Sequence, residues 1–253
     1  MSAIKNYERS LERSRASLHH GERPRTFTLA GAEWHLLEGV FAPPFSASTG
    51  MAMELLGLAG PDPAPWKGSF LEVGSGTGVI AVSAALAGCD RVTALDISEQ
   101  AVRNTAMNAA RHDVADRVHA VHSDLFDALA PEDRHDTVYW HSNFVLAPPE
   151  YRYASVHERA YVDPGYRAHR RYLAECLSYV TPGGRALLQF SERGDLDTLE
   201  TMAAGCDRRV RELRSGTVRE GTDTVEYALL EITDAAAERL GAPNPPPPAT
   251  GAR

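Results

Sequence analysis

The sequence predicts an α/β protein with a Rossmann-like, seven-stranded, mostly parallel sheet, an antiparallel last strand and helices on both faces. Three observations carry this prediction. From Ser69 onward, short apolar runs typical of buried strands alternate with runs typical of helices, the pattern of parallel βαβ units. A glycine-rich loop follows the first of these strands. Two late runs, 208–214 and 224–232, follow each other without a helix and predict an antiparallel pair.

Each expected element has a residue range. Before the sheet, residues 1–22 carry charges at salt-bridge spacing and predict an exposed helix. Residues 26–37 predict a hairpin, followed by a loop from Gly39 and a helix at 51–58. The strands of the sheet are expected at 70–73, 91–95, 118–122, 137–140, 185–190, 208–214 and 224–232. Its helices are expected at 79–87, at 98–111 with Ser98 as N-cap, and at 166–180, closed by Pro182-Gly183-Gly184.

The chain divides into three parts. Residues 1–60 are expected to form a helical and hairpin lid, and residues 61–233 the α/β domain. Residues 234–253, which include Pro245 to Pro248, are expected to be a flexible tail. The segment 142–165 is long for a connection between a strand and a helix, and it is rich in tyrosine. Such insertions are usually functional, so it is expected to form a wall of the substrate site.

Composition limits the partners. The formal net charge is −8, whereas phosphate contacts favour a basic protein, so nucleic acid is not expected as the partner. No apolar run reaches the ~18 residues of a membrane span, and the N-terminus is polar, so a cytoplasmic protein without a membrane partner is expected. The cysteines and histidines lack metal-binding spacing, and no metal is expected. The oligomeric state stays open.

The glycine-rich loop Gly74-Ser75-Gly76-Thr77-Gly78 lies between a strand and a helix, at the place where open α/β sheets bind ligands. Glycines let the backbone turn sharply and approach a ligand closely. The helix behind the loop begins with unpaired N–H donors. Asp96 ends the next strand, where a carboxylate can accept both hydroxyls of a ribose. The pattern therefore predicts a ligand that contains a nucleoside.

Two ligand classes fit this pattern. Dinucleotide-binding proteins use GxGxxG, but here the third glycine comes one residue early and Val79 takes the place of that glycine. Glu72 also precedes the loop, and its carboxylate would repel a pyrophosphate while attracting the ammonium of a methionine. Spacing and charge both favour S-adenosylmethionine (SAM) as the cofactor.

The chain resembles the class I SAM-dependent methyltransferases over about residues 68–232. The likeness rests on four segments: 70–81 with the glycine loop, Ala94-Leu-Asp-Ile-Ser98, His122-Ser-Asp-Leu-Phe126, and 177–188 with Pro-Gly-Gly. It implies that Asp124 binds the adenine amino group. The cofactor-binding residues expected in these segments are Glu72, Gly74, Ser75, Gly76, Gly78, Asp96, Ile97, Asp124 and Leu125.

Within that family the chain is most similar to the release-factor glutamine methyltransferase type. Gly39-Val-Phe-Ala-Pro-Pro44 and Ser48-Thr49 resemble the segment that covers the cofactor there, which implies that Phe41 and Thr49 line the SAM site. Packing between hairpin and core is the alternative for Phe41. That group carries Asn-Pro-Pro-Tyr after the fourth strand to hold a planar amide or amino nitrogen. This chain has His141-Ser142-Asn143-Phe144 instead.

His141 is the expected catalytic residue, beside both the cofactor and the acceptor. An imidazole that titrates near pH 6.5 can take a proton from an attacking hydroxyl or amine. A purely structural hydrogen bond is the alternative. Trp140 and Phe144 could flank the sulfonium or could simply pack in the core. Other possible bases are Glu150, His157 and Asp163, and the expected substrate residues are Phe144, Tyr151 and Tyr161.

These observations favour methyl transfer to an oxygen or nitrogen of a small molecule, in specialised natural-product metabolism. The altered Asn-Pro-Pro-Tyr segment and the acidic charge carry that expectation. One alternative is an N-methyltransferase that acts on glutamine or another side chain of a protein. A second alternative is a SAM-binding protein without catalysis.

Overall fold

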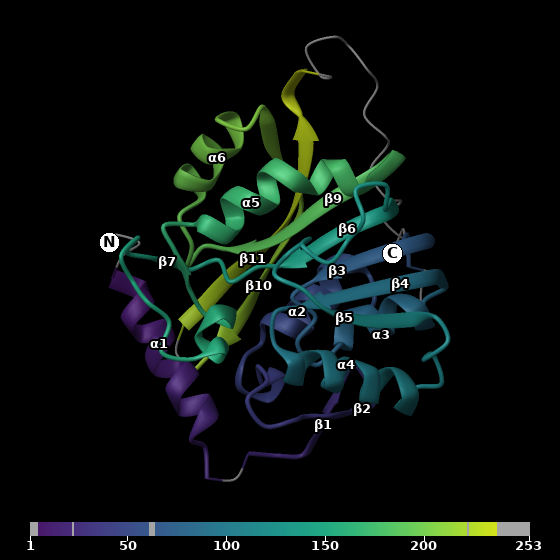
Figure 1. Cartoon of the computed structure of the whole chain (residues 1–253). Helices are drawn as coiled ribbons and strands as arrows, with labels where there is room; N and C mark the ends of the chain where they lie inside the picture. The colour runs from purple at the N-terminus through teal and green to yellow at the C-terminus, as the bar shows by residue number, and fades with distance from the viewer. Residues whose placement is uncertain (1–4, 22, 61–63, 222, 237–253) are drawn as a thin grey trace.

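The computed structural model describes residues 5–21, 23–60, 64–221 and 223–236. Its centre is a seven-stranded sheet in the order β10-β11-β9-β6-β3-β4-β5 (Figure 1). Strand β11 pairs antiparallel with β9 and β10, and the pairs among β9, β6, β3, β4 and β5 are parallel, so the predicted fold class is confirmed. The strands are β3 (Gly68–Val73), β4 (Cys89–Asp96), β5 (Val118–His122), β6 (His135–His141), β9 (Val180–Ser191), β10 (Arg208–Glu220) and β11 (Asp223–Asp234).

Helices cover both faces of this sheet. They are α2 (Ser48–Leu56), α3 (Val79–Leu86), α4 (Glu99–Arg111), α5 (Arg167–Glu175) and α6 (Leu196–Ala204). Successive side chains of a strand point to opposite faces. Phe70 and Tyr139 accordingly pack in a cluster with α2, α3 and α4, whereas Leu71 and Val138 pack with α5 and α6. The strands are therefore buried on both faces, which explains their continuous apolar runs.

The helix predicted at 166–180 is shorter than expected. It ends at Glu175 and continues as a 3₁₀ turn, η3 (Cys176–Tyr179). Pro182-Gly183-Gly184 does not close the helix but lies inside β9. A Cβ at Gly184 would come within 2.7 Å of the Asp136 carbonyl oxygen, so the glycine allows β9 to pass close to β6. The same motif thus serves strand pairing rather than helix termination.

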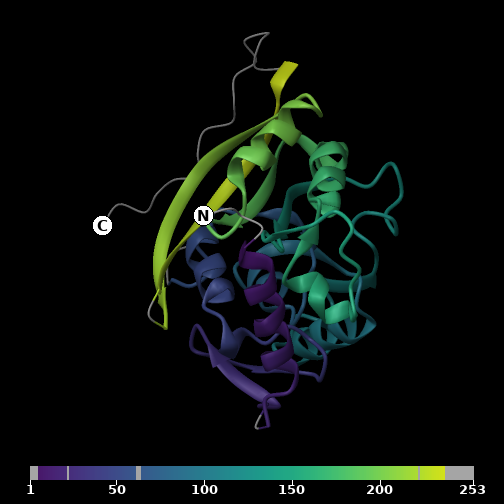
Figure 2. The same cartoon turned by 90° about the vertical axis from the view of Figure 1, so that its left-hand side faces the viewer.

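The C-terminal pair is longer than predicted, and Figure 2 shows it as a long curved ribbon. Strand β10 has 13 residues and β11 has 12, with a register shift at Glu212 and Arg214. Residues 215–220 are mostly polar, so their apolar content did not mark them as a strand. Helix α6 between β9 and β10 was not predicted either.

The N-terminal segment contains helix α1 (Lys5–Leu18) and the predicted hairpin of β1 (Thr26–Leu29) and β2 (Ala32–His35), followed by a 3₁₀ turn, η1 (Pro43–Phe45). The prediction that this helix is exposed was wrong, because one face of α1 packs on the insertion. Ser10, Leu11, Ser14 and Ser17 are buried there, and the Ser10 hydroxyl donates to the Tyr161 carbonyl at 2.9 Å.

The insertion 142–165 has structure of its own. A two-stranded parallel pair, β7 (Leu146–Ala147) with β8 (Asp163–Pro164), closes it, and a 3₁₀ turn, η2 (Val156–Ala160), lies between these strands. Helix α2 precedes the predicted domain boundary at residue 60 yet packs in the same cluster as β3 and α3. Most of the predicted tail, 237–253, lies outside the described residues. Within the described residues, no helix is both long and apolar enough to cross a bilayer.

Candidate active site

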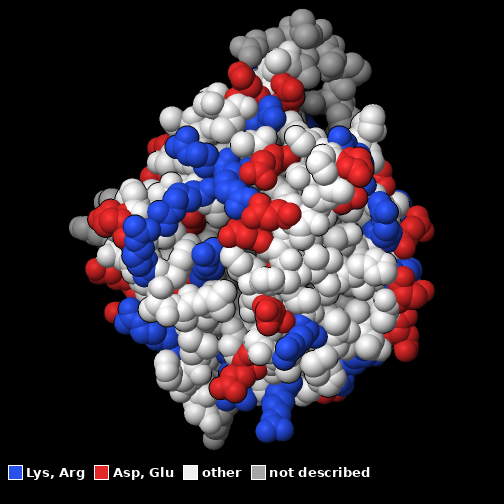
Figure 3. Space-filling model, in the orientation of Figure 1, with Lys and Arg blue, Asp and Glu red and all other residues white. Residues whose placement is uncertain are grey.

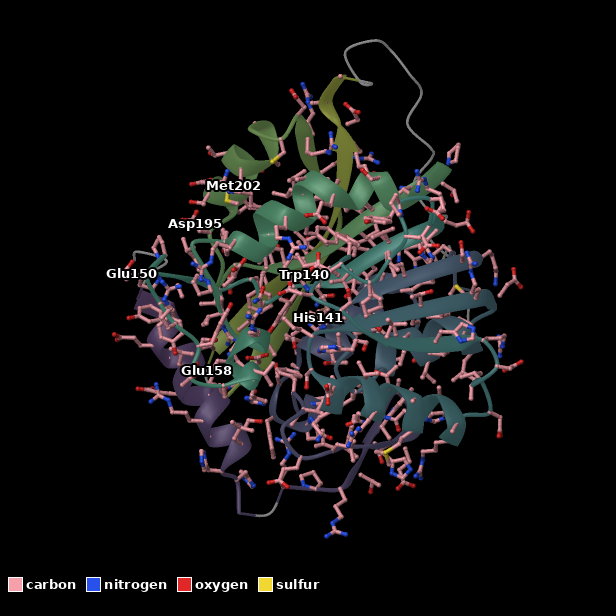
Figure 4. The ribbon with its side chains drawn as sticks, viewed as in Figure 1. Trp140, His141, Glu150, Glu158, Asp195 and Met202 are labelled. Carbon is pink, nitrogen blue, oxygen red and sulfur yellow. The ribbon has the colours of Figure 1, made fainter. Side chains whose placement is uncertain are left out.

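The main cavity opens at the carboxyl ends of β3, β4 and β6, where the sequence placed the ligand. Its volume is about 210 Å³. The glycine loop, the end of β4 and the segment after β6 line one part of it, while α1, the insertion, Arg193 and Tyr227 line the rest. Figure 4 shows Trp140 and His141 near the centre of the molecule, at the end of β6.

The glycine loop and Asp96 form one hydrogen-bonded unit. Gly74 and Gly76 have φ values of 68° and 55°, the left-handed region that glycine adopts without strain. The Gly76 N–H donates to Asp96 Oδ2 at 2.8 Å, and the Ser98 N–H donates to Asp96 Oδ1 at 2.8 Å. Burial raises the pKa of Asp96, against the effect of these bonds. A carboxylate held this rigidly presents its remaining lone pairs to the cavity.

Glu72 lies beneath the loop, at the methionine end expected from its sequence position. Its side chain is buried, lines the cavity, and accepts the Ala81 N–H through Oε2 at 2.9 Å. Burial raises the pKa of Glu72 well above its ordinary value. An ammonium ion beside Glu72 would oppose that effect, because an opposite charge favours the ionised carboxylate.

Gly78 departs from its expected role. It does not line the cavity, although the other predicted members of the loop do. Its φ is 78°, and a Cβ there would lie 2.8 Å from Thr105 Cα. Gly78 therefore allows α3 to pack closely on α4, and its place in the structure supports a packing role.

Ile97, Asp124 and Leu125, the residues expected at the adenine end, all line the cavity. In this structure Asp124 is paired with two arginines. Its Oδ2 lies 3.6 Å from Arg159 Nη1, and its Oδ1 accepts from Arg171 Nη1 at 3.2 Å. The family resemblance implies that Asp124 also binds the adenine amino group. The Asp124 carboxylate would then accept hydrogen bonds from both adenine and the two arginines.

Phe41 and Thr49 also line the cavity. The Phe41 ring packs on Tyr161, with ring centroids 5.4 Å apart. The backbone at the start of α2 is tied to the sheet, since the Gln189 side chain donates to the Ser48 carbonyl at 3.2 Å. The structure thus brings the predicted covering segment over the cofactor end, and the two alternatives for Phe41, packing and cavity lining, both hold.

His141 is the last residue of β6 and faces the cavity. Burial lowers its pKa to about 4, so its imidazole is uncharged at pH 7. Within the described part of the chain, its side chain makes no hydrogen bond. Beside it, Trp140 lines the cavity, packed against His169 and Tyr172 with ring centroids 4.7 and 5.1 Å apart.

The insertion contributes some of the predicted substrate residues. Phe144 and Tyr161 line the cavity, whereas Tyr151 does not line it in this structure, so a substrate contact for Tyr151 stays a prediction without support from the cavity. The Tyr151 hydroxyl donates to Glu158 Oε2 at 2.9 Å, and its ring packs on Tyr153. Alternating tyrosines gave no sign of which would turn toward the cavity.

The other candidate bases have different roles. Asp163 is buried and accepts from His169 Nδ1 at 2.8 Å, which joins the insertion to α5. His157 shares a hydrogen bond of 2.7 Å with the Ser14 hydroxyl of α1. Glu150 is exposed at the edge of the molecule, away from His141 (Figure 4). The described residues hold no group of three or more His, Cys, Asp or Glu placed to bind a metal ion.

Sequence reasoning missed several cavity residues. Ser10 and Arg13 come from α1, Arg193 follows β9, and Tyr227 lies on β11. No local motif marks them, because each is far in sequence from the glycine loop. The alternation of small and charged residues along one side of α1 was the only available signal.

Comparison with known proteins agrees with this geometry. The family model of the ribosomal protein L11 methyltransferase matches residues 49–140. The release factor glutamine methyltransferase of Thermosynechococcus vestitus is 26% identical over 209 residues, covering 76% of this chain and 70% of the relative. The ribosomal protein uL3 glutamine methyltransferase of Bordetella pertussis is 30% identical over 145 residues, covering 52% of this chain and 48% of the relative.

The chain belongs to the class I SAM-dependent methyltransferases. Its cofactor is SAM, as the glycine loop, Glu72 and Asp96 indicated. Pyrococcus horikoshii TYW2, solved in complex with MeSAdo, is similar in structure with a TM-score of 0.56 at 14% identity, covering 83% of this chain and 71% of that one. At that identity the likeness concerns the fold.

The relatives correct the expected substrate. Those named above are methyltransferases of release factors and ribosomal proteins, not enzymes of natural-product metabolism. The expectation of a small-molecule substrate and partner was therefore wrong. It overvalued the change from Asn-Pro-Pro-Tyr to His141-Ser-Asn-Phe. Matches to ribosomal protein L11 methyltransferases cover much less, for example 22% of the Pelotomaculum thermopropionicum relative at 44% identity over 71 residues.

Proposed function

We propose that this methyltransferase transfers a methyl group from SAM to a side-chain nitrogen of a protein, with the amide of glutamine as the favoured acceptor. One observation carries the choice of an amide: the group at the end of β6 is an uncharged imidazole without a partner among the described residues. A neutral imidazole has one acceptor nitrogen and one N–H donor. A primary amide offers the complementary N–H and C=O groups.

The three carboxylates that line the cavity suit a SAM cofactor. Glu72 would face the ammonium, Asp96 the ribose hydroxyls and Asp124 the adenine end. When bound, SAM supplies a methyl group on a positively charged sulfur. The acceptor nitrogen would form a bond to that carbon while the electrons of the carbon–sulfur bond go to sulfur, and the nitrogen would give up one proton to water.

His141 has a positioning task in this reaction. Its pKa of about 4 makes it a weak base toward an amine, but it leaves the ring free to accept a hydrogen bond at neutral pH. Holding the acceptor nitrogen in line with the methyl group can supply ~7–11 kcal/mol of the barrier. Trp140, next to it on the cavity wall, would contact the sulfonium through its ring.

The charge distribution supports a protein acceptor. In the view of Figure 3, basic and acidic side chains lie interspersed, with a line of basic ones at the upper left bordered by acidic ones. A protein that binds the phosphate backbone of a nucleic acid is expected to carry a large basic face, whereas this chain has a net charge of −8.

Methyl-labelled SAM tests the proposal. The protein is incubated with labelled SAM and with the protein, RNA and small-molecule fractions of a cell extract. Label is expected in protein, and acid hydrolysis should release it as methylamine, because hydrolysis of an N-methyl amide frees the amine. Label mainly in RNA or in small metabolites would overturn the proposal. Label in protein that hydrolysis retains on lysine or arginine would overturn the amide assignment.

A further inference from the structure

The two ends of the cavity carry opposite charges. The carboxylates that line it, Glu72, Asp96 and Asp124, all belong to the cofactor end. The arginines that line it are Arg13 from α1, Arg159 from the insertion and Arg193 from the loop after β9. Arg159 lies where the acidic and basic ends of the cavity meet, since it pairs with Asp124. The far end, away from the glycine loop, is thus lined by Arg13 and Arg193 without a carboxylate.

Arg13 and Arg193 are held together by one buried carboxylate. Glu220 of β10 accepts through Oε2 from Arg13 Nη2 at 3.1 Å and from Arg193 Nη1 at 2.6 Å. Its Oε1 accepts from the Tyr227 hydroxyl at 2.8 Å. The Glu220 side chain is 11% exposed, those of Arg13 and Arg193 34% and 19%. Burial would raise the pKa of Glu220, but the bonds from Arg193 and Tyr227 lower it below its ordinary value.

Most of the donors of these two guanidinium groups remain available. Each group makes a single side-chain hydrogen bond within the described residues, to the same oxygen of Glu220. An arginine carries several N–H donors in a planar fork that matches a carboxylate. Two arginines against one glutamate leave a local charge of about +1 at the cavity wall. A second, small cavity between Arg9, Arg13 and Arg193 continues this basic surface.

We propose that Arg13 and Arg193 bind a carboxylate of the protein substrate, the side chain of an aspartate or glutamate close in sequence to the methylated residue. This inference rests on the proposed function, because it assigns the acceptor of that reaction an acidic neighbour. Glu220 orients both arginines from below and neutralises one of their charges. The remaining single positive charge matches a singly charged carboxylate better than a phosphate, which carries more negative charge.

The position of this pair sets its task. In the proposed reaction, SAM at the glycine loop would present its methyl group near His141. Arg13 and Arg193 line the same cavity, and Val145 lies beside them, since it lines the small second cavity with both arginines. A peptide whose acceptor side chain reaches His141 would therefore pass the two arginines with a neighbouring residue. Charge-assisted hydrogen bonds of this kind are about twice as strong as neutral ones, so they discriminate acidic from neutral neighbours.

A peptide library tests the inference. Immobilised peptides with a central glutamine carry aspartate, glutamate, asparagine or glutamine at each of the flanking positions, and methylation by labelled SAM is measured. Peptides with an acidic neighbour at one or two fixed positions should be methylated with at least tenfold higher kcat/KM, about 1.4 kcal/mol. Arg13→Met and Arg193→Met should each reduce that ratio several-fold, and Arg193→Lys should retain part of it.

The ratio of acidic to neutral peptides is read within each variant, so a loss of folded protein does not imitate the effect. Arg15→Met is the matched control, because Arg15 is an exposed arginine of the same helix and does not line the cavity. Methylation of peptides without any acidic preference, or a preference that both arginine variants retain, would overturn the inference while leaving the proposed function intact. Methylation of RNA but of no peptide would overturn the proposed function itself.

Discussion

The two ends of the cavity are built in different ways. The cofactor end comes mainly from residues 72–125, where Asp96 accepts from Gly76 across a sequence separation of 20 residues. The acceptor end is assembled from remote parts. Ser14 meets His157 across 143 residues, and Arg13 meets Glu220 across 207. A motif can encode the first kind of site, whereas only the folded chain creates the second.

The chemical character differs in the same way. The cofactor end repeats a fixed task, so its carboxylates and glycines stand at the spacing that SAM requires. The acceptor end must fit a particular partner, and here it combines a neutral imidazole with a pair of arginines. The proposed recognition of the substrate therefore depends on contacts that join α1 to the insertion and to the antiparallel pair of β10 and β11.

The largest effect is expected at the cofactor end. Asp96→Ala removes both the acceptor of the Gly76 N–H and the proposed acceptor of the ribose hydroxyls. SAM affinity should fall about 100-fold, or ~2.7 kcal/mol, measured by isothermal titration. Asp90→Ala, at an exposed position of the same strand, is the matched control and should keep the wild-type affinity. If the Asp96 variant binds SAM as tightly as the wild type, Asp96 does not bind the ribose hydroxyls.

The next largest effect is expected at His141, which lies between the cofactor end and the acceptor end of the cavity. His141→Asn should keep SAM affinity within about tenfold, ~1.4 kcal/mol, and lower kcat for the protein substrate about tenfold or more. Because burial lowers the His141 pKa to about 4, kcat of the wild type should show no inflection near pH 6.5. A pH–rate profile with an inflection there would show that the residue acts as an ordinary imidazole base.

Acid should lower the free energy of unfolding, in part because His157 becomes protonated. Burial lowers its pKa to about 4, against an ordinary value near 6.5, with Arg23 lowering it further and Glu158 opposing. The unfolded chain then binds more protons between these values, so the free energy of unfolding falls as pH drops from about 6.5 to 4.

The imidazole of His157 can be isolated by comparing variants. In urea unfolding, the stability lost between pH 7 and pH 5 should be about 2 kcal/mol smaller for His157→Asn than for the wild type. His119→Asn, at an exposed position of β5, should lose as much as the wild type. If His157→Asn and the wild type lose the same amount, the burial of this imidazole does not contribute to acid sensitivity.

The smallest effect is expected at Tyr151, which lies outside the cavity. Tyr151→Phe removes only the hydroxyl bond to Glu158, and kcat/KM for the protein substrate should stay within about twofold of the wild type. Tyr161→Ala, which removes a ring from the cavity wall, should raise KM measurably in the same assay. A strong loss of kcat/KM in Tyr151→Phe would show that the Tyr151 hydroxyl contributes to substrate binding.

The sequence predicted the parts of the fold that depend on local patterns. Apolar runs located the strands β3 to β6, the glycine loop located the cofactor, and Ser98 proved to be the N-cap of α4, accepting from the Ala101 N–H. The ends of the elements were less accurate. Pro182-Gly183-Gly184 is locally a helix stop, but close pairing of β9 with β6 places it in a strand.

By itself the sequence determined the fold class, the SAM cofactor and most of the loop and carboxylate residues that line this part of the cavity, because backbone turns and carboxylate spacing act over a few residues. Tertiary structure alone decided that Gly78 packs closely against Thr105 and that the Tyr151 hydroxyl bonds to Glu158. It also decided that Arg13 and Arg193 converge on Glu220. These outcomes depend on which distant surfaces meet when the apolar faces are buried, and no local pattern encodes that meeting.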